Sequence, residues 1–191
     1  MNNLFPVFLK LEQMQLLIVG GGYVGLEKLE AVLKNSPETS ITIVAPEISA
    51  DIQELSQLHN IQLIFEPYQR VHLEGKNLVI VGTGLMEVSE QVQKDCRQAN
   101  ILVNVADKPS LCDFYLSSTV KKGDLKIAIS TNGKSPTFAK RFREILEEML
   151  PDSLQETLDN LQAIRDRLKG DFEYKVEKLN EITNVMKNDK N

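Results

Sequence analysis

The chain has 191 residues, 42% of them hydrophobic and 26% charged, which is typical of a globular protein with its own core. Its net charge of −5 disfavours nucleic acid and anionic membranes as partners. No run approaches the ~18 apolar residues of a membrane span. The start of the chain has no signal-peptide pattern, and Cys96 and Cys112 make no disulfide framework. A cytoplasmic protein is expected.

The first strongly patterned stretch is an apolar strand that runs into a glycine-rich turn. Residues 16–19 are all apolar, and Gly20, Gly22 and Gly25 follow with the G-x-G-x-x-G spacing. Gly20 is expected to allow the tight turn, Gly22 to let a pyrophosphate approach the backbone, and Gly25 to let the next helix pack closely. That helix, over residues 23–35, is amphipathic. This context favours a nucleotide site over a purely structural turn.

After this turn, apolar strands alternate with amphipathic helices. The expected strands are residues 41–45, 61–65, 77–81 and 101–106, and the expected helices are residues 48–58 and 85–98. This alternation predicts right-handed crossovers and therefore an α/β fold with a Rossmann-type parallel sheet. Residues 5–11 also alternate, and we expect them to add an edge strand beside the first core strand.

The end of the second strand differs from a conventional NAD site, which has an Asp or Glu there to bind the ribose. The sequence is Val44-Ala45-Pro46-Glu47, so Glu47 is the nearest acid. Glu47 fits the start of a helix equally well, because an acid there suits the helix dipole. Thr83 follows the fourth strand, and it suits either a dinucleotide contact or a cap for the next helix.

Asp107 leaves the fifth strand at the carboxyl edge of the sheet, where open α/β sheets place their chemistry. A carboxylate there can act as a base or metal ligand, and partial burial would favour a role as base. Asp107-Lys108-Pro109 is also a common turn element, and spacing alone does not decide between these roles. His59 and His72 lack the spacing of a metal site, so no metal ligand is predicted.

The second half of the chain predicts one strand and three helices. They are the strand at residues 125–130 and the helices at residues 136–149, 152–168 and 171–186, followed by a disordered tail after Met186. Ser135 and Pro136 suit the N-cap and first position of the first helix. Four basic residues here are candidates for binding substrate carboxylates, although charge alone favours a solvated helix face. They are Lys134, Lys140, Arg141 and Arg143.

Four stretches in order resemble the precorrin-2 dehydrogenase family, the amino-terminal module of siroheme synthases. They are FPVFLKLE with LLIVGGGYVGLEKLEAVL, then VAPEI, NVADKPSLCDFY and IAISTNGKSPTFAKRFREILEEMLP, and the resemblance covers about residues 3–168. Two departures concern loops. Ser117 stands where the family commonly has a proline, and the turn at residues 82–85 lacks acids often found there.

The resemblance implies a cytoplasmic homodimer that uses NAD to oxidise precorrin-2 to sirohydrochlorin in siroheme biosynthesis. Some members also insert ferrous iron, and the sequence leaves this ferrochelatase activity open. Asp107 falls on the catalytic aspartate of the family, while Tyr23, Val24, Pro46 and Glu47 fall on NAD contacts. The four basic residues would then meet the carboxylates of the tetrapyrrole.

The resemblance also suggests a layout in three parts. We expect an NAD-binding Rossmann domain at residues 1–112, a small α+β dimerisation segment at residues 113–150 and a helical domain at residues 151–191. The alternative is a non-catalytic NAD-sensing Rossmann module. Such modules usually end the second strand with an acid, where this chain has Ala45.

Overall fold

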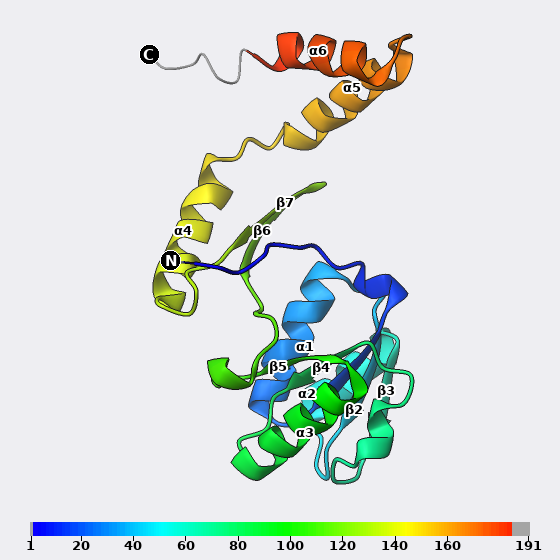
Figure 1. Cartoon of the computed structure of the whole chain (residues 1–191), viewed down its shortest axis with the longest axis vertical. Coiled ribbons are helices and arrows are strands. Elements are labelled where there is room, and N and C mark those ends of the chain that lie inside the picture. The colour runs from blue at the N-terminus through cyan, green and yellow to red at the C-terminus, as the bar shows by residue number, and fades with distance from the viewer. Residues whose placement is uncertain (1, 185–191) are drawn as a thin grey trace. The chain divides into compact units, whose positions relative to one another are not determined.

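The computed structural model describes residues 2–184, which form two compact units (Figure 1). We name residues 3–116 the sheet unit and residues 117–184 the hairpin unit. The expected disordered tail lies outside the described residues, and the expected layout in three parts stays a prediction. No helix within residues 2–184 is long and apolar enough to cross a membrane.

The sheet unit has five parallel strands in the order β3-β2-β1-β4-β5. The strands are β1 Gln15–Val19, β2 Ser40–Val44, β3 Ile61–Ile64, β4 Leu78–Val81 and β5 Leu102–Val105. The helices are α1 Tyr23–Asn35, α2 Ala50–Leu58 and α3 Met86–Ala99, with short 3₁₀ helices η1 Leu11–Gln13, η2 Arg70–Leu73 and η3 Pro109–Leu111. The predicted Rossmann-type sheet is confirmed.

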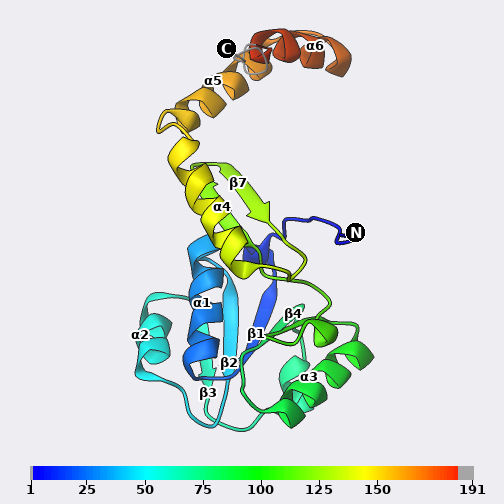
Figure 2. The ribbon, with the colours of Figure 1, turned by 90° about the vertical axis from the view of Figure 1, so that its left-hand side faces the viewer.

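Both faces of the sheet are covered, which explains why its strands are mostly apolar. Leu16 and Ile18 pack with α1 and α2 on one face, whereas Leu17 and Val19 pack with α3 on the other. Figure 2 shows these helices on opposite sides of the sheet. Successive strand residues alternate between the two faces, so every position of β1 after Gln15 is buried.

The predicted edge strand at residues 5–11 is wrong. Residues 2–10 form neither helix nor strand, and η1 follows them. Because β1 pairs with β2 on one side and β4 on the other, no edge is free beside it. Pro6 also lacks the N–H that a ladder would need.

The hairpin unit contains an antiparallel pair of strands and three helices. They are β6 Ser118–Lys122, β7 Leu125–Ile129, α4 Pro136–Met149, α5 Leu154–Arg167 and α6 Phe172–Thr183. Ser135 caps α4 as predicted, because its side chain accepts a hydrogen bond from the Phe138 N–H at 3.1 Å. Strand β6 is not among the expected elements. Its signal is the two-residue turn Gly123-Asp124, where Gly123 takes a positive φ of 57°.

Candidate functional site

The glycine turn after β1 is closely packed at Gly20, Gly21 and Gly25, and the first and last of these show why glycine is needed. Gly20 has a φ of +125°, and a Cβ there would lie 2.5 Å from the carbonyl oxygen of Gly82. A Cβ on Gly25 would overlap the carbonyl oxygen of Gly20, so α1 can approach the turn only with glycine at this position. These two glycines set the path of the backbone between β1 and α1.

Gly22, the N-cap of α1, has the opposite surroundings. A Cβ there would meet no atom within 4 Å. Among residues 2–184 no side chain caps α1, and its first turn holds no acid, whereas α2 and α3 begin with Asp51 and Glu87. An uncapped helix N-terminus beside an open glycine fits a pyrophosphate, which needs N–H donors and a positive dipole end.

Backbone hydrogen bonds join the turn to the ends of the neighbouring strands. The Gly20 N–H donates to Val44 at 3.0 Å, and the Gly82 N–H donates to Val19 at 2.8 Å. On the far side of β4, the Ala106 N–H donates to Val81 at 2.9 Å. The carboxyl ends of β1, β2, β4 and β5 therefore meet at one edge, which brings together the candidate residues of the sheet unit.

Glu47 lies outside α2, the helix whose start it was expected to suit. The N-cap of α2 is Ser49 and its first-turn acid is Asp51, so Glu47 does not serve that helix dipole. The Ser49 N–H donates to the Gly21 carbonyl at 2.9 Å, which fixes this segment against the glycine turn. The side chains of Glu47 and Pro46 are exposed beside the turn.

Thr83 closes a local turn instead of capping the first turn of α3. Its Oγ1 accepts a hydrogen bond from the N–H of Leu85, the N-cap residue of α3, at 3.2 Å. Because this oxygen serves as an acceptor, the hydroxyl proton of Thr83 can still be donated to a ligand.

Asp107 stands at the tip of the turn that follows β5. The Lys108 N–H donates to Val105 at 3.2 Å, and Asp107 takes a left-handed φ of 59°. The side chain of Asp107 is exposed, so it lacks the partial burial that would favour a role as base. The reason is the turn, which carries the residue beyond the last buried position of β5. A non-glycine residue in this conformation is uncommon, although Asp and Asn tolerate it best.

Three residues that the sequence analysis does not single out hold the base of this turn. We call Asn104, Cys112 and Asp113 the edge clamp. The Asp113 N–H donates to Val103, and a carboxylate oxygen of Asp113 accepts the Val103 N–H at 3.0 Å. The Asn104 amide donates to the Phe114 carbonyl at 2.8 Å. A polar residue inside an apolar strand, such as the buried Asn104, was the available signal.

The structure does not place the four basic candidates on one edge. Lys140 and Arg141 line a shallow hollow on α4, and Lys134 is exposed in the turn before that helix. Arg143 projects about 200° around the helix from Arg141, because each residue adds about 100°. Its guanidinium binds both carboxylate oxygens of Glu147, at 2.9 and 3.1 Å.

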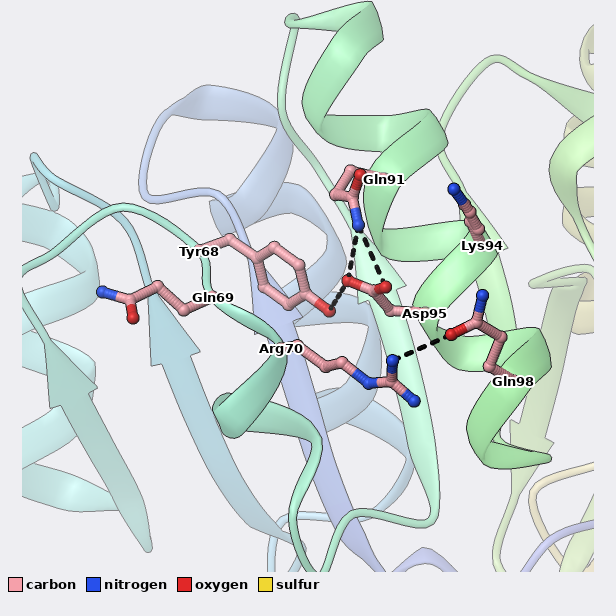
Figure 3. A pocket seen from close by; sticks show the side chains of 7 residues that line it. All are labelled: Tyr68, Gln69, Arg70, Gln91, Lys94, Asp95 and Gln98. Carbon is pink, nitrogen blue, oxygen red and sulfur yellow. Dashed lines mark hydrogen bonds between the residues drawn. The ribbon is translucent and has the colours of Figure 1, made fainter.

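A hollow of about 460 Å³ lies beside η2 and α3 in the sheet unit (Figure 3). Its centre is the buried Asp95, which accepts hydrogen bonds from the Tyr68 hydroxyl at 3.2 Å and from Gln91 at 3.0 Å. Burial, followed by the charge of Asp95, raises the pKa of Tyr68 well above its usual range. None of the predicted site residues lines this hollow. Within residues 2–184, no group of three or more His, Cys, Asp or Glu could hold a metal ion.

The parallel sheet and the open glycine turn at its carboxyl edge define a dinucleotide-binding protein of the Rossmann type. Residues 7–118 match a family model described as putative NAD(P)-binding, and residues 122–149 match one described as sirohaem biosynthesis protein central. The chain belongs to this NAD(P)-binding family, whose cofactors are nicotinamide dinucleotides.

Several similar proteins are described as siroheme synthases. The siroheme synthase of Psychrobacter sp. (strain PRwf-1) is 38% identical over 168 residues, which are 88% of this chain and 34% of that protein. The siroheme synthase of Pseudoalteromonas translucida (strain TAC 125) is 37% identical over 169 residues, 88% of this chain and 35% of that protein. The chain thus spans about a third of the length of these relatives.

A solved structure described as SirC, precorrin-2 dehydrogenase, matches over nearly its whole length. The TM-score is 0.73 and the sequence identity 28%, and the match covers 94% of this chain and 89% of that one. The resemblance to the precorrin-2 dehydrogenase family is confirmed by these findings.

Proposed function

We propose that this protein is an NAD-dependent precorrin-2 dehydrogenase that forms sirohydrochlorin in siroheme biosynthesis. The observation that carries the proposal is the match to SirC over 94% of this chain, together with an exposed carboxylate at the cofactor edge. A non-catalytic NAD-sensing module would have no use for that carboxylate. The two free thiols, Cys96 and Cys112, suit a reducing cytoplasm.

The preference for NAD over NADP rests on the end of β2. Residues 44–49 contain Glu47 and no Lys or Arg, so this segment offers an acceptor for ribose hydroxyls and no cation for a 2′-phosphate. Gly20, Gly22 and Gly25 would shape the pyrophosphate site. Tyr23, Val24, Pro46 and Thr83 would complete the cofactor contacts.

Bound NAD supplies the hydride acceptor, and the chain must supply the base. Asp107 is suited to this role, because its carboxylate is exposed at the carboxyl edge and Ala106, the residue before it, is bonded to β4. Asp107 would accept the proton that leaves precorrin-2, directly or through one water molecule.

The hairpin unit would recognise the carboxylates of the substrate and pair two copies of the chain. Lys134, Lys140 and Arg141 are exposed, whereas Arg143 is already engaged by Glu147, so we expect the first three to contribute most. A homodimer is supported by an exposed apolar row on α4 with helical spacing. Its members are Phe138, Phe142, Ile145 and Met149.

The test is Asp107→Asn, assayed by NADH formation from precorrin-2 and NAD. Asparagine tolerates the left-handed φ of this position, so the change removes the charge and leaves the turn intact. We expect kcat to fall by about 100-fold or more, while the Kd for NAD stays within about twofold of the wild-type value because the cofactor contacts are retained.

Each outcome has a defined meaning. Near-normal turnover by the variant would reject Asp107 as the base. A wild-type protein that binds NAD but never oxidises precorrin-2 would instead support the sensing module. Sirohydrochlorin with ferrous or cobaltous ion in the same assay measures chelation, which the sequence leaves open.

A further inference from the structure

The thiol of Cys112 contacts both sides of the turn that carries Asp107. Its Sγ lies 3.2 Å from the carbonyl oxygen of Val105 and 3.3 Å from that of Lys108. The Val105 N–H also donates to the same sulfur, at 3.2 Å. One side chain therefore links the last residue of β5 to the residue that follows Asp107.

The rest of the edge clamp prevents Cys112 from moving away. Asp113 is bonded in both directions to Val103, at 2.8 Å through its N–H and at 3.0 Å through its carboxylate. Asn104, only 6% exposed, holds the Phe114 carbonyl from the other side of Cys112. Residues 112–114 are thus tied to the free edge of β5 by Asp113 and Asn104, which keeps Cys112 beside the turn.

The thiol must keep its proton to bond a carbonyl, and its surroundings favour that state. Burial raises the pKa of Cys112, with a smaller increase from the nearby charge of Asp113, while the Val105 N–H acts in the opposite direction. At neutral pH the sulfur therefore remains a donor to Val105 or Lys108.

We propose that Cys112 is a positioning residue that holds the turn of Asp107 in its left-handed conformation at the carboxyl edge. This inference rests on the proposed function, because it assigns Cys112 an effect on catalysis through Asp107. Cys112 would touch neither the substrate nor the cofactor.

The test compares Cys112→Ala with Cys112→Ser. Alanine removes the links to Val105 and Lys108, and we expect kcat to fall by about 10-fold while the KM for NAD changes less than about twofold, because only the base is misplaced. Serine keeps a donor and an acceptor on a shorter bond, and we expect it to restore kcat to within about threefold of wild type.

A double variant separates positioning from general damage. If Cys112 acts only through Asp107, then Cys112→Ala in the Asp107→Asn background lowers the residual rate no further. The matched control is Cys96→Ala, which removes the other free thiol, buried on α3, and should leave kcat unchanged.

Three results would overturn the inference. They are normal kcat in Cys112→Ala, equal losses in the alanine and serine variants, or fully multiplicative losses in the double variant. Failure of the proposed function looks different, because Asp107→Asn would then turn over normally whatever residue occupies position 112.

Discussion

The two units of this protein stabilise themselves by different means. In the sheet unit, the central strands are buried on both faces and form two apolar clusters. In the hairpin unit, Val120 and Ala139 are the only buried hydrophobic residues among residues 117–184. The same unit exposes Phe142 and Met149 on α4 and Phe172 on α6. The sheet unit can thus form a self-sufficient frame, whereas the hairpin unit lacks a core of its own.

This difference suggests a division of labour. A rigid sheet edge holds the backbone groups that a dinucleotide requires, and the close glycine contacts fix the positions of these groups. An apolar surface without a core is suited to association, because burial against a second copy supplies the missing hydrophobic free energy. We therefore expect changes in the two units to have separable effects.

The largest effect is expected within the glycine turn of the sheet unit. Gly25→Ala places a Cβ onto the Gly20 carbonyl, so α1 must move away from β1. We expect a loss of more than about 4 kcal/mol in unfolding free energy, measured by urea denaturation, and no detectable NAD binding.

Gly22→Ala is the matched control for that prediction. Its Cβ enters open space, and Gly22 has a φ of −93°, which alanine adopts without strain. We expect a loss of only about 1 kcal/mol from the poorer N-cap. The methyl group occupies the expected pyrophosphate position, so NAD affinity should still fall at least about 10-fold by calorimetry. Equal stability losses in the two variants would contradict this packing argument.

A smaller loss of unfolding free energy is expected from a change in the core of the sheet unit, and its counterpart is a change on the surface of α4. Ile18 is fully buried and pairs in register with Ile43 and Ile80. Ile18→Ala should cost about 3 kcal/mol through lost contacts and a cavity, measured by hydrogen exchange of the β1 amides.

Phe142→Ser should leave those amides unchanged and convert a dimer to monomers in sedimentation velocity. Phe142 is 41% exposed and lies in the middle of the apolar row. Its ring stacks on that of Phe138, with 5.8 Å between the ring centroids. A wild-type monomer, or a variant that still dimerises, would remove association as the role of this surface.

The sequence predicts the sheet unit well, because burial on both faces produces apolar strands and one-sided burial produces amphipathic helices. The wrong edge strand at residues 5–11 shows the limit of this approach. Alternation is a local property, whereas a place in the sheet depends on which distant strands already flank β1. Strand β6 is missed because its own residues are mostly polar and show no apolar pattern. The sequence signal for it was the Gly123-Asp124 turn that joins it to β7.

The candidate site is predictable only in part. The glycine spacing and Asp107 leave local signals, whereas in the edge clamp only Asn104 does, as a polar residue inside an apolar strand. Cys112 and Asp113 act through irregular backbone that returns to β5 after several residues, and no hydrophobic period reveals such pairing. The spread of the basic residues around α4 also depends on helix phase and on ion pairs such as Arg143 with Glu147.

The smallest effect concerns the response of the sheet unit to alkaline pH. Burial raises the pKa of the Cys96 thiol from 9.0 to about 12 in the folded chain, with a further contribution from Asp95. Because the folded pKa lies above the unfolded one, this stabilisation is complete below pH 9 and is lost as pH rises toward 12. The unfolding free energy should fall by about 1.4 kcal/mol per pH unit in this range for each such group.

Cys96→Ala should remove the contribution of this thiol, so the unfolding free energy should fall less steeply with pH. The variant should also be slightly less stable than the wild type at pH 7. Urea midpoints at pH 8, 9 and 10 provide the measurement. Tyr68 acts in the same direction, but because its ordinary pKa is 10.0 and burial raises that pKa in the folded chain, it contributes only above about pH 10. Tyr68→Phe should therefore leave the change in midpoint between pH 8 and 9 as in the wild type. Neither residue belongs to the hairpin unit, so the sedimentation coefficient should stay constant between pH 8 and 10. Dissociation over that range without any change in the β1 amides would place the sensitive groups in the hairpin unit, contrary to this assignment.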